Sequence, residues 1–263
     1  MSGENLNDGV KWEFYLDGET RDFRSFSEAQ RSLYFHISGG IDHYHDCMND
    51  DFRFSSVYFD DEDDPEVVWQ IGYELASLYN GISSILGKVR RKLELADLIH
   101  NGVKVRKPPK RNIVALLGKP SISDHLYSQE FERVKQANVR FFMINLATER
   151  EDAYLILKYF DIEESYINYY KILETLEALS KKTGIPISVD QKLRKAFTNT
   201  ANNYTLSGLD SRHGFKEAVK ENKTPSMELS EAHSFVTSIA KEYLNNLAHG
   251  VLQGTHNKSF KMD

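Results

Sequence analysis

The chain has 263 residues, of which 40% are hydrophobic, a formal net charge of −6 and one cysteine. This composition can fill a core, and the acidic charge argues against a protein that coats nucleic acid by bulk attraction, because non-specific phosphate binding needs a basic surface. One cysteine excludes an intrachain disulfide framework, and no apolar run reaches the roughly 18 residues that a membrane span requires. Since the first residues lack the basic and apolar parts of a secretory signal, we expect a cytoplasmic protein without a membrane partner.

The first 60 residues predict mostly strands. Aromatic and aliphatic residues at 12–16 run into Asp17-Gly18, a pair that favours a turn. A second run of aromatic and β-branched residues at 52–59 predicts another strand. Residues 27–37 leave two alternatives open, a short helix or a strand that ends at a Gly39-Gly40 turn.

A long helix is predicted from Pro65 to about residue 86. Apolar residues recur along it at helical spacing, Asp64 can cap its start, and Gly87 can end it. The basic residues 104–111, which contain a double proline, predict a short strand followed by an exposed connector. We therefore expect an α+β protein in three parts: a β-containing N-terminal domain over 1–110, a helical domain over 120–250 and a tail over 251–263.

Two further helices are predicted in the middle of the chain. One begins at Ser123 or Asp124 and runs to about residue 137. The pattern Thr148-Glu-Arg-Glu151 has the form of a capping box, which predicts a helix over 149–160. Residues 141–146 are compatible with a strand or with a continuation of the first of these helices.

The C-terminal half carries the strongest helical patterns. Tyrosines and leucines share one side of a helix over 166–179, and Thr183-Gly-Ile-Pro stops it. Ser188-Val-Asp-Gln191 has the form of a second capping box, which begins the next helix. A Ser230 cap begins the last helix, whose apolar residues follow the i, i+3, i+4, i+7 series to residue 247.

Two carboxylates lie on or near the apolar side of the helix over 166–179. Glu177 falls about 20° around the helix from Tyr166, and Glu174 lies at the margin of the apolar arc. Because an unpaired buried charge costs several kcal/mol, a cation should approach this face. We expect Arg212, in the polar segment 207–214, to pair with Glu174 or Glu177, and breaking a partly buried pair to cost about 3 kcal/mol.

Four short motifs resemble those of a known class of helical proteins. They are similar to bacterial families labelled methylamine-utilisation-protein-J-like and, more distantly, to the HEPN superfamily, over residues 166–247. The motifs are Tyr169-Tyr-Lys-Ile-Leu-Glu174, Leu193-Arg-Lys-Ala-Phe-Thr-Asn-Thr-Ala-Asn202, Ser211-Arg-His-Gly214 and Met227-Glu-Leu-Ser-Glu-Ala-His-Ser-Phe-Val236.

The resemblance implies an antiparallel bundle of four or five helices that dimerises, binds RNA or a nucleotide in a defence or stress role, and needs no cofactor. HEPN ribonucleases are metal-independent and carry an arginine four to six residues before a histidine. Arg212 and His213 are the candidate catalytic pair here, but they are adjacent, so we expect ribonuclease activity to be weak at most. The expected binding residues are Lys171, Glu174, Glu177 and Asn202.

Arg212 and His213 support two interpretations. In the functional one, the guanidinium of Arg212 holds a phosphate oxygen and the imidazole of His213 transfers protons at neutral pH. In the structural one, which we favour, Arg212 pins the polar loop onto the bundle through Glu174 or Glu177. The protein is then a non-catalytic dimeric scaffold with a purely structural arginine–glutamate network.

The segment His43-Tyr-His-Asp-Cys47 holds residue types that bind zinc. A second ligand pair at ordinary spacing is absent nearby in the sequence. We therefore interpret the segment as a polar loop and expect no metal site.

Overall fold

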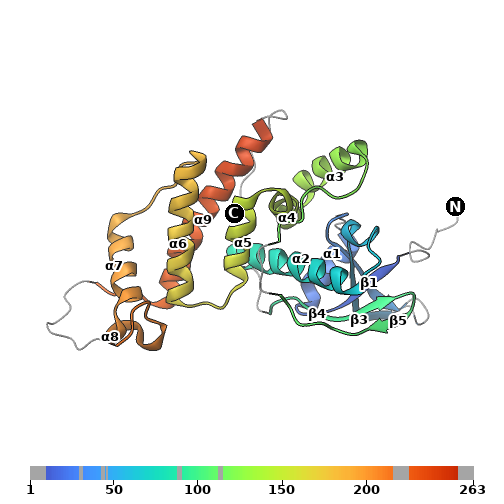
Figure 1. Ribbon diagram of the computed structural model, residues 1–263, viewed down its shortest axis with the longest axis horizontal. Coiled ribbons are helices and arrows are strands. Elements are labelled where there is room, and N and C mark those ends of the chain that lie inside the picture. Colours follow the sequence, from blue (N-terminus) through green and yellow to red (C-terminus); the bar gives the residue numbers. More distant parts are fainter. Residues whose placement is uncertain are drawn as a thin grey trace. The chain divides into compact units, whose positions relative to one another are not determined.

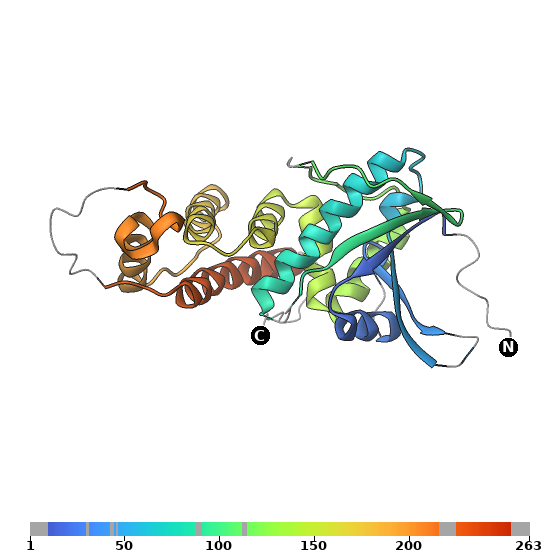
Figure 2. The same cartoon turned by 90° about the horizontal axis from the view of Figure 1, so that it is seen from below.

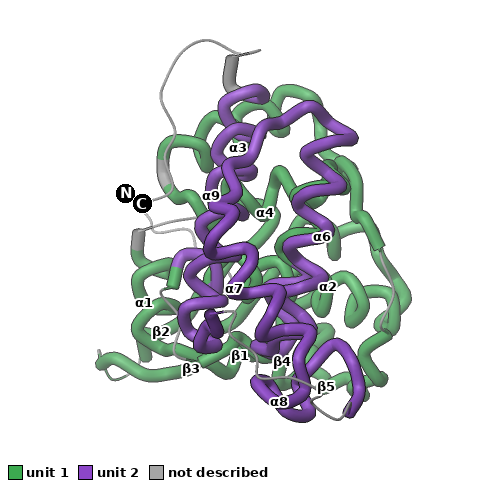
Figure 3. The backbone as a smooth tube through the Cα atoms, turned by 90° about the vertical axis from the view of Figure 1, so that its left-hand side faces the viewer, with its two compact units in different colours: residues 1–83, 87–157 green, residues 84–86, 158–263 purple. Residues whose placement is uncertain are grey.

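We analysed a computed structural model of the chain, which describes residues 10–29, 32–42, 45, 47–87, 91–111, 115–215 and 225–253. The chain forms two compact units (Figure 3): unit 1 comprises residues 1–83 and 87–157, and unit 2 comprises residues 84–86 and 158–263. The domain boundary expected between residues 110 and 120 falls inside unit 1. Residues 120–157 therefore belong to the same unit as the strands.

Unit 1 combines an antiparallel sheet with helices (Figures 1 and 2). Within the described residues the sheet has five strands in the order β2-β3-β1-β4-β5, and each neighbouring pair is antiparallel. The chain is therefore α+β, as predicted. The elements in chain order are β1 (Trp12–Asp17), α1 (Thr20–Ala29), β2 (His36–Asp42), β3 (Cys47–Ser55), η1 (Val57–Phe59), α2 (Pro65–Leu86), β4 (Glu94–His100), β5 (Val103–Val105), α3 (Asp124–Ala137), α4 (Val139–Glu149) and α5 (Glu151–Asp161).

The core of unit 1 lies between the sheet and α2. Phe14 of β1 is fully buried, and its ring meets the ring of Trp69 edge-on at a centroid distance of 4.8 Å. The predicted start of α2 is confirmed, since Oδ1 of Asp64 accepts the backbone N–H of Glu66 at 2.8 Å. The predicted end is also confirmed, because Gly87 follows the helix with a φ of +65°. Both signals are local, which is why the sequence alone reveals them.

The turn at Gly39-Gly40, which is part of one of the two alternatives for this segment, is wrong. β2 runs through both glycines, and its register with β3 shifts there, as at a β-bulge. Gly39 has a φ of +94°, and a Cβ on it would lie 2.1 Å from the carbonyl oxygen of Asp51, so glycine is required by the close approach of β3. The missed turn is Asn101-Gly102, with φ of +49° and +80°, which joins β4 to β5 in a hairpin.

Several other boundaries differ from the expected ones. The strand predicted over 52–59 ends at Ser55, and the 3-10 helix η1 follows it. Residues 27–37 contain both alternatives, the end of α1 and the start of β2. Residues 141–146 are helical, within α4, and the capping box expected at Thr148 is wrong. Its Oγ1 donates to the carbonyl of Asn145 inside α4, and α5 begins at Glu151.

Unit 2 is built on three long helices in the described part of the chain. α7 runs antiparallel to α6, because Arg194 pairs with Glu177, whereas α9 runs parallel to α6, with His233 bonded to Tyr169 near the start of both. The result is an up-down-up arrangement with short helical turns after α7 (Figure 1). The elements are α6 (Tyr166–Thr183), α7 (Gln191–Asn202), α8 (Tyr204–Ser207), η2 (Gly208–Asp210) and α9 (Leu229–Gln253).

The ends of these helices test the predicted caps. Gly184 ends α6 with a φ of +76°, as predicted. The cap of α7 is Asp190 rather than Ser188, whose backbone N–H and hydroxyl instead donate to Glu242 of α9. α9 begins one residue before the predicted Ser230 cap and continues to Gln253, while residues 254–263 of the expected tail lie outside the described residues.

None of the helices in the described residues combines the length and apolar character of a membrane span.

Candidate functional site

A salt bridge joins α6 to α7. Nε and Nη2 of Arg194 donate to the two carboxylate oxygens of Glu177 at 2.9 and 3.1 Å. These hydrogen bonds raise the pKa of the Arg194 guanidinium above its ordinary value. The expectation that a cation meets the carboxylates of α6 is confirmed, but the partner of Glu177 is Arg194.

Arg212 is the cation that meets Glu174. Its Nη2 lies 3.6 Å from Oε1 of Glu174, and its guanidinium carbon lies 4.2 Å from the centre of the Tyr170 ring. Its backbone N–H donates to the carbonyl of Ala201 at 2.7 Å, which folds the loop back on the end of α7. The predicted pairing of Arg212 with Glu174 or Glu177 is thus confirmed for Glu174.

The expected strength of this pair needs correction. The side chains of Arg212 and Glu174 are 41% and 54% exposed, so water screens the ion pair and the figure of about 3 kcal/mol for a partly buried pair does not apply. An exposed ion pair contributes about 0–1 kcal/mol, and an exposed cation–π contact adds about 0.5–1 kcal/mol.

We expect Arg212→Ala to lower the free energy of unfolding of unit 2 by about 1 kcal/mol, because two exposed contacts are lost. Arg212→Lys keeps the charge and loses the planar stacking on Tyr170, so its free energy of unfolding should lie between those of Arg212→Ala and the wild type. Urea unfolding followed by circular dichroism at 222 nm measures both. A loss above about 3 kcal/mol for Arg212→Ala would show that the pair acts as a buried one.

His213 has different surroundings from Arg212. Its side chain is exposed, and its backbone N–H donates to Oγ of the buried Ser211 at 3.3 Å. The guanidinium of Arg212, by contrast, contacts Glu174 and Tyr170 of α6. The two candidate catalytic residues are therefore adjacent in sequence, but only Arg212 has a partner on the bundle that the structure records.

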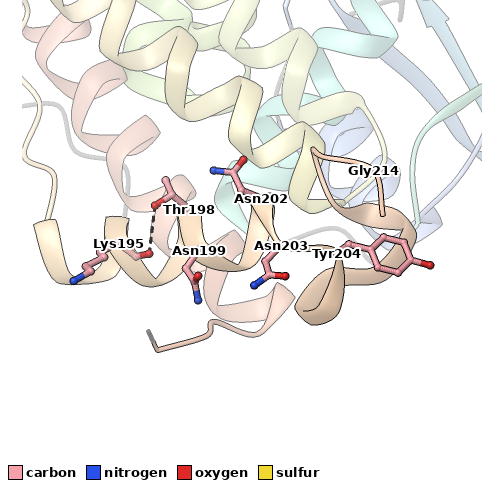
Figure 4. Close-up of a pocket in the computed structure, with 7 residues that line it drawn as sticks. All are labelled: Lys195, Thr198, Asn199, Asn202, Asn203, Tyr204 and Gly214. Atoms are coloured by element: carbon pink, nitrogen blue, oxygen red, sulfur yellow. Dashed lines mark hydrogen bonds between the residues drawn. The ribbon is translucent and has the colours of Figure 1, made fainter. Parts of the chain in front are cut away.

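A polar hollow of about 530 Å³ lies along α7 and the loop after it (Figure 4). Asn202 is the only residue of the predicted site that lines it, whereas Lys171 is exposed on α6. Gly214 lines the hollow directly after Arg212 and His213 in the chain. The lining residues are Lys195, Thr198, Asn199, Asn202, Asn203, Tyr204 and Gly214.

The lining follows from the periodicity of α7. Residues 195, 198, 199 and 202 are spaced i, i+3, i+4 and i+7, so they form one polar stripe. The opposite stripe, with Phe197 and Ala201, is buried in unit 2. Sequence reasoning followed the apolar stripe and missed Lys195 and Asn199. The polar stripe was the signal that predicts this hollow.

The polar atoms of the hollow differ in their partners. Oδ1 of Asn203 accepts the backbone N–H and the hydroxyl of Thr205. Nδ2 of Asn199 donates to the carbonyl of Pro225 at 3.3 Å. Oδ1 of Asn202 is buried and has no hydrogen-bond partner among the described residues, and such an atom ordinarily has one. The buried Oδ1 of Asn202 is not accessible to a ligand, so hydrogen bonds with a polar ligand in the hollow fall to Lys195 and to the amides of Asn199 and Asn203.

The lining residues suit binding better than acid–base chemistry. They include one ammonium group, amides, hydroxyls and backbone, and no carboxylate or imidazole is among the described lining residues. General acid–base catalysis most often uses an imidazole or a carboxylate, and the described lining supplies neither.

The zinc alternative at residues 43–47 falls largely outside the described residues, which include only His45 and Cys47 of this segment. Nδ1 of His45 lies 2.7 Å from Oδ2 of Asp42, and Cys47 is an exposed thiol at the start of β3. Among the described residues, no group of three or more His, Cys, Asp or Glu side chains is placed to hold a metal ion.

Comparisons of the chain with protein-family models, with curated proteins and with solved structures found no match.

Proposed function

We propose that the chain is a cytoplasmic protein whose unit 2 binds RNA or a nucleotide at the polar hollow, without requiring catalysis. The observation that carries this proposal is the lining itself, which gathers Lys195, the amides of Asn199 and Asn203 and the Tyr204 ring around one space of about 530 Å³. An ammonium group pairs with phosphate, amides hydrogen-bond with base edges and ribose, and an aromatic ring stacks on bases. The defence or stress role remains an implication of the HEPN resemblance.

The distribution of charge supports the same proposal. Residues 158–263 contain 14 Lys and Arg against 13 Asp and Glu, so the acidic net charge of the chain lies in the residues before them. Lys192, Arg194 and Lys195 add positive charge along α7, although Arg194 is paired with Glu177. The acidic balance that argues against bulk attraction of nucleic acid therefore does not extend to the hollow.

A binding test separates this site from general charge. Lys195 lines the hollow, and Lys192 is an exposed lysine on the same helix that does not. We expect Lys195→Ala to weaken binding of a fluorescein-labelled 12-nucleotide single-stranded RNA about fivefold. The slope of log affinity against log salt concentration should become less steep by about 0.7, because one phosphate contact is lost. Lys192→Ala should stay within about twofold of the wild type. Fluorescence anisotropy from 50 to 200 mM salt gives both quantities.

Equal losses in the two lysine variants would assign the binding to general charge, and absence of binding by the wild type would contradict the proposal. The same RNA, incubated in EDTA and analysed on a denaturing gel, should remain largely intact. Robust cleavage that is lost in His213→Ala would instead assign catalysis to Arg212 and His213.

The second candidate is a dimeric interaction scaffold. The contacts of Arg194 and Arg212, which pair with Glu177 and Glu174 within the chain, support its structural arginine–glutamate network. The tyrosines of α6 give less support to a dimer than expected. Tyr166 donates to the carbonyl of Met227 and Tyr169 bonds with His233, so both are covered within unit 2. Light scattering that shows a dimer together with no RNA binding would favour this candidate.

A further inference from the structure

An aromatic pair with one half-buried ring and one exposed ring adjoins the polar hollow. Tyr204 lines the hollow, and its ring meets the ring of Phe215 edge-to-face at a centroid distance of 5.4 Å and an angle of 90°. Phe215 follows the lining residue Gly214 and is 73% exposed. We call Tyr204 and Phe215 the aromatic rim.

The exposure of Phe215 distinguishes it from the other aromatic side chains in the described part of unit 2. Phe160, Phe197 and Phe235 are at most 6% exposed, as expected for a residue type that is usually buried. Phe215 instead presents most of its ring to solvent at the edge of a polar space. Leu209, from the short helical turn that precedes this loop, is 92% exposed, so a second apolar side chain in this segment faces solvent.

A flat apolar ring next to hydrogen-bonding groups matches the chemistry of a nucleobase. Bases stack on aromatic side chains regardless of their sequence, because every base has a π face. Inside a duplex both faces of a base are covered by its neighbours, so a protein ring stacks mainly on unpaired bases. Since residues 158–263 are close to electrically neutral, affinity at this site cannot depend on charge alone.

We infer that the site selects unpaired bases, with one base stacked on Phe215 and its ribose and phosphate held in the polar hollow. This inference rests on the proposed function and deepens it, because it names single-stranded RNA as the ligand class and stacking as the source of selectivity. Tyr204 is then shared by the two parts of the site. It lines the hollow and supports the Phe215 ring edge-on.

Three labelled probes test the inference: a single-stranded 12-nucleotide oligoadenylate, a strand of the same length and phosphate number with abasic sites, and a 12-base-pair duplex, which has about twice as many phosphates. We expect the wild type to bind the single strand about tenfold more tightly than either of the others. Phe215→Leu should lose most of this preference with little change in affinity for the abasic probe, and Phe215→Trp should keep it. Leu193→Ala, at an exposed apolar position of α7 outside the rim, is the control and should bind all three probes as the wild type does.

The outcomes separate the two proposals. Equal binding of the single-stranded and abasic probes, or full selectivity in Phe215→Leu, would overturn the stacking inference while leaving binding at the hollow intact. Absence of binding of every probe by the wild type would overturn both the inference and the proposed function. Circular dichroism of each variant checks that α7 and α9 remain folded.

Discussion

Gly81→Ala is expected to lower the free energy of unfolding of unit 1 by about 3 kcal/mol, although alanine is the better helix former. Gly81 lies inside α2, where a Cβ would sit 2.0 Å from the carbonyl oxygen and 2.7 Å from the carbonyl carbon of Leu157. These are backbone atoms of α5, so no side-chain rotation can relieve the clash. The two helices would have to move apart.

The matched control is Gly250→Ala in α9. Gly250 is also helical, but a Cβ on it meets nothing within 4 Å. Alanine there should stabilise the protein by about 0.5–1 kcal/mol through helix propensity alone. Trp12 and Trp69 both belong to unit 1, so tryptophan fluorescence during urea unfolding reports Gly81→Ala. Circular dichroism reports Gly250→Ala. A Gly81→Ala variant as stable as the wild type would contradict the contact between α2 and α5.

Arg140→Ala is expected to destabilise unit 1 by about 3–5 kcal/mol. Arg140 is 6% exposed, and its Nη1 lies 3.1 Å from Oδ2 of Asp22. The Arg140 guanidinium also faces the rings of Phe26 and Tyr79. Burial raises the pKa of the Tyr79 phenol. The side chain of Asp22 is only 16% exposed. Removing the arginine therefore leaves a largely buried carboxylate without this partner.

Two comparisons make this result specific. Arg21→Ala removes an exposed arginine beside Asp22 in sequence and should change stability by less than about 0.5 kcal/mol. Arg140→Met with Asp22→Leu removes both charges and fills much of the space, so it should recover a large part of the loss. If Arg140→Ala were as mild as Arg21→Ala, the pair would contribute no more than a surface ion pair.

The sequence predicts local signals in this fold better than long-range ones. Gly87 and Gly184 end α2 and α6 as expected, because a residue with positive φ is a property of a few neighbouring positions. Gly39 has the same local signature, but its role depends on Asp51 of the neighbouring strand. Ser188 looks like a cap, yet its actual partner is Glu242 on α9. Contacts between distant segments decided both cases.

The candidate site shows the same division. The helical period of α6 indicated that Glu174 and Glu177 needed cations, and the structure supplies Arg212 and Arg194. The pairing of each glutamate with its arginine depends on how α7 packs against α6. The helical periodicity of α6 carries no information about that packing. The polar stripe of α7 was readable from its spacing. Its importance became visible only once the loop after α7 placed Tyr204 and Gly214 beside it.

The central claim is that RNA contacts the polar hollow and its rim, and photo-cross-linking tests it most directly. A single-stranded RNA that carries 4-thiouridine is irradiated with the full chain, and the cross-linked peptides are identified by mass spectrometry. Cross-links are expected within residues 195–215, centred on Tyr204 and Phe215, and they should weaken in Lys195→Ala. Cross-links confined to the strands of unit 1, or unchanged in Lys195→Ala, would contradict it.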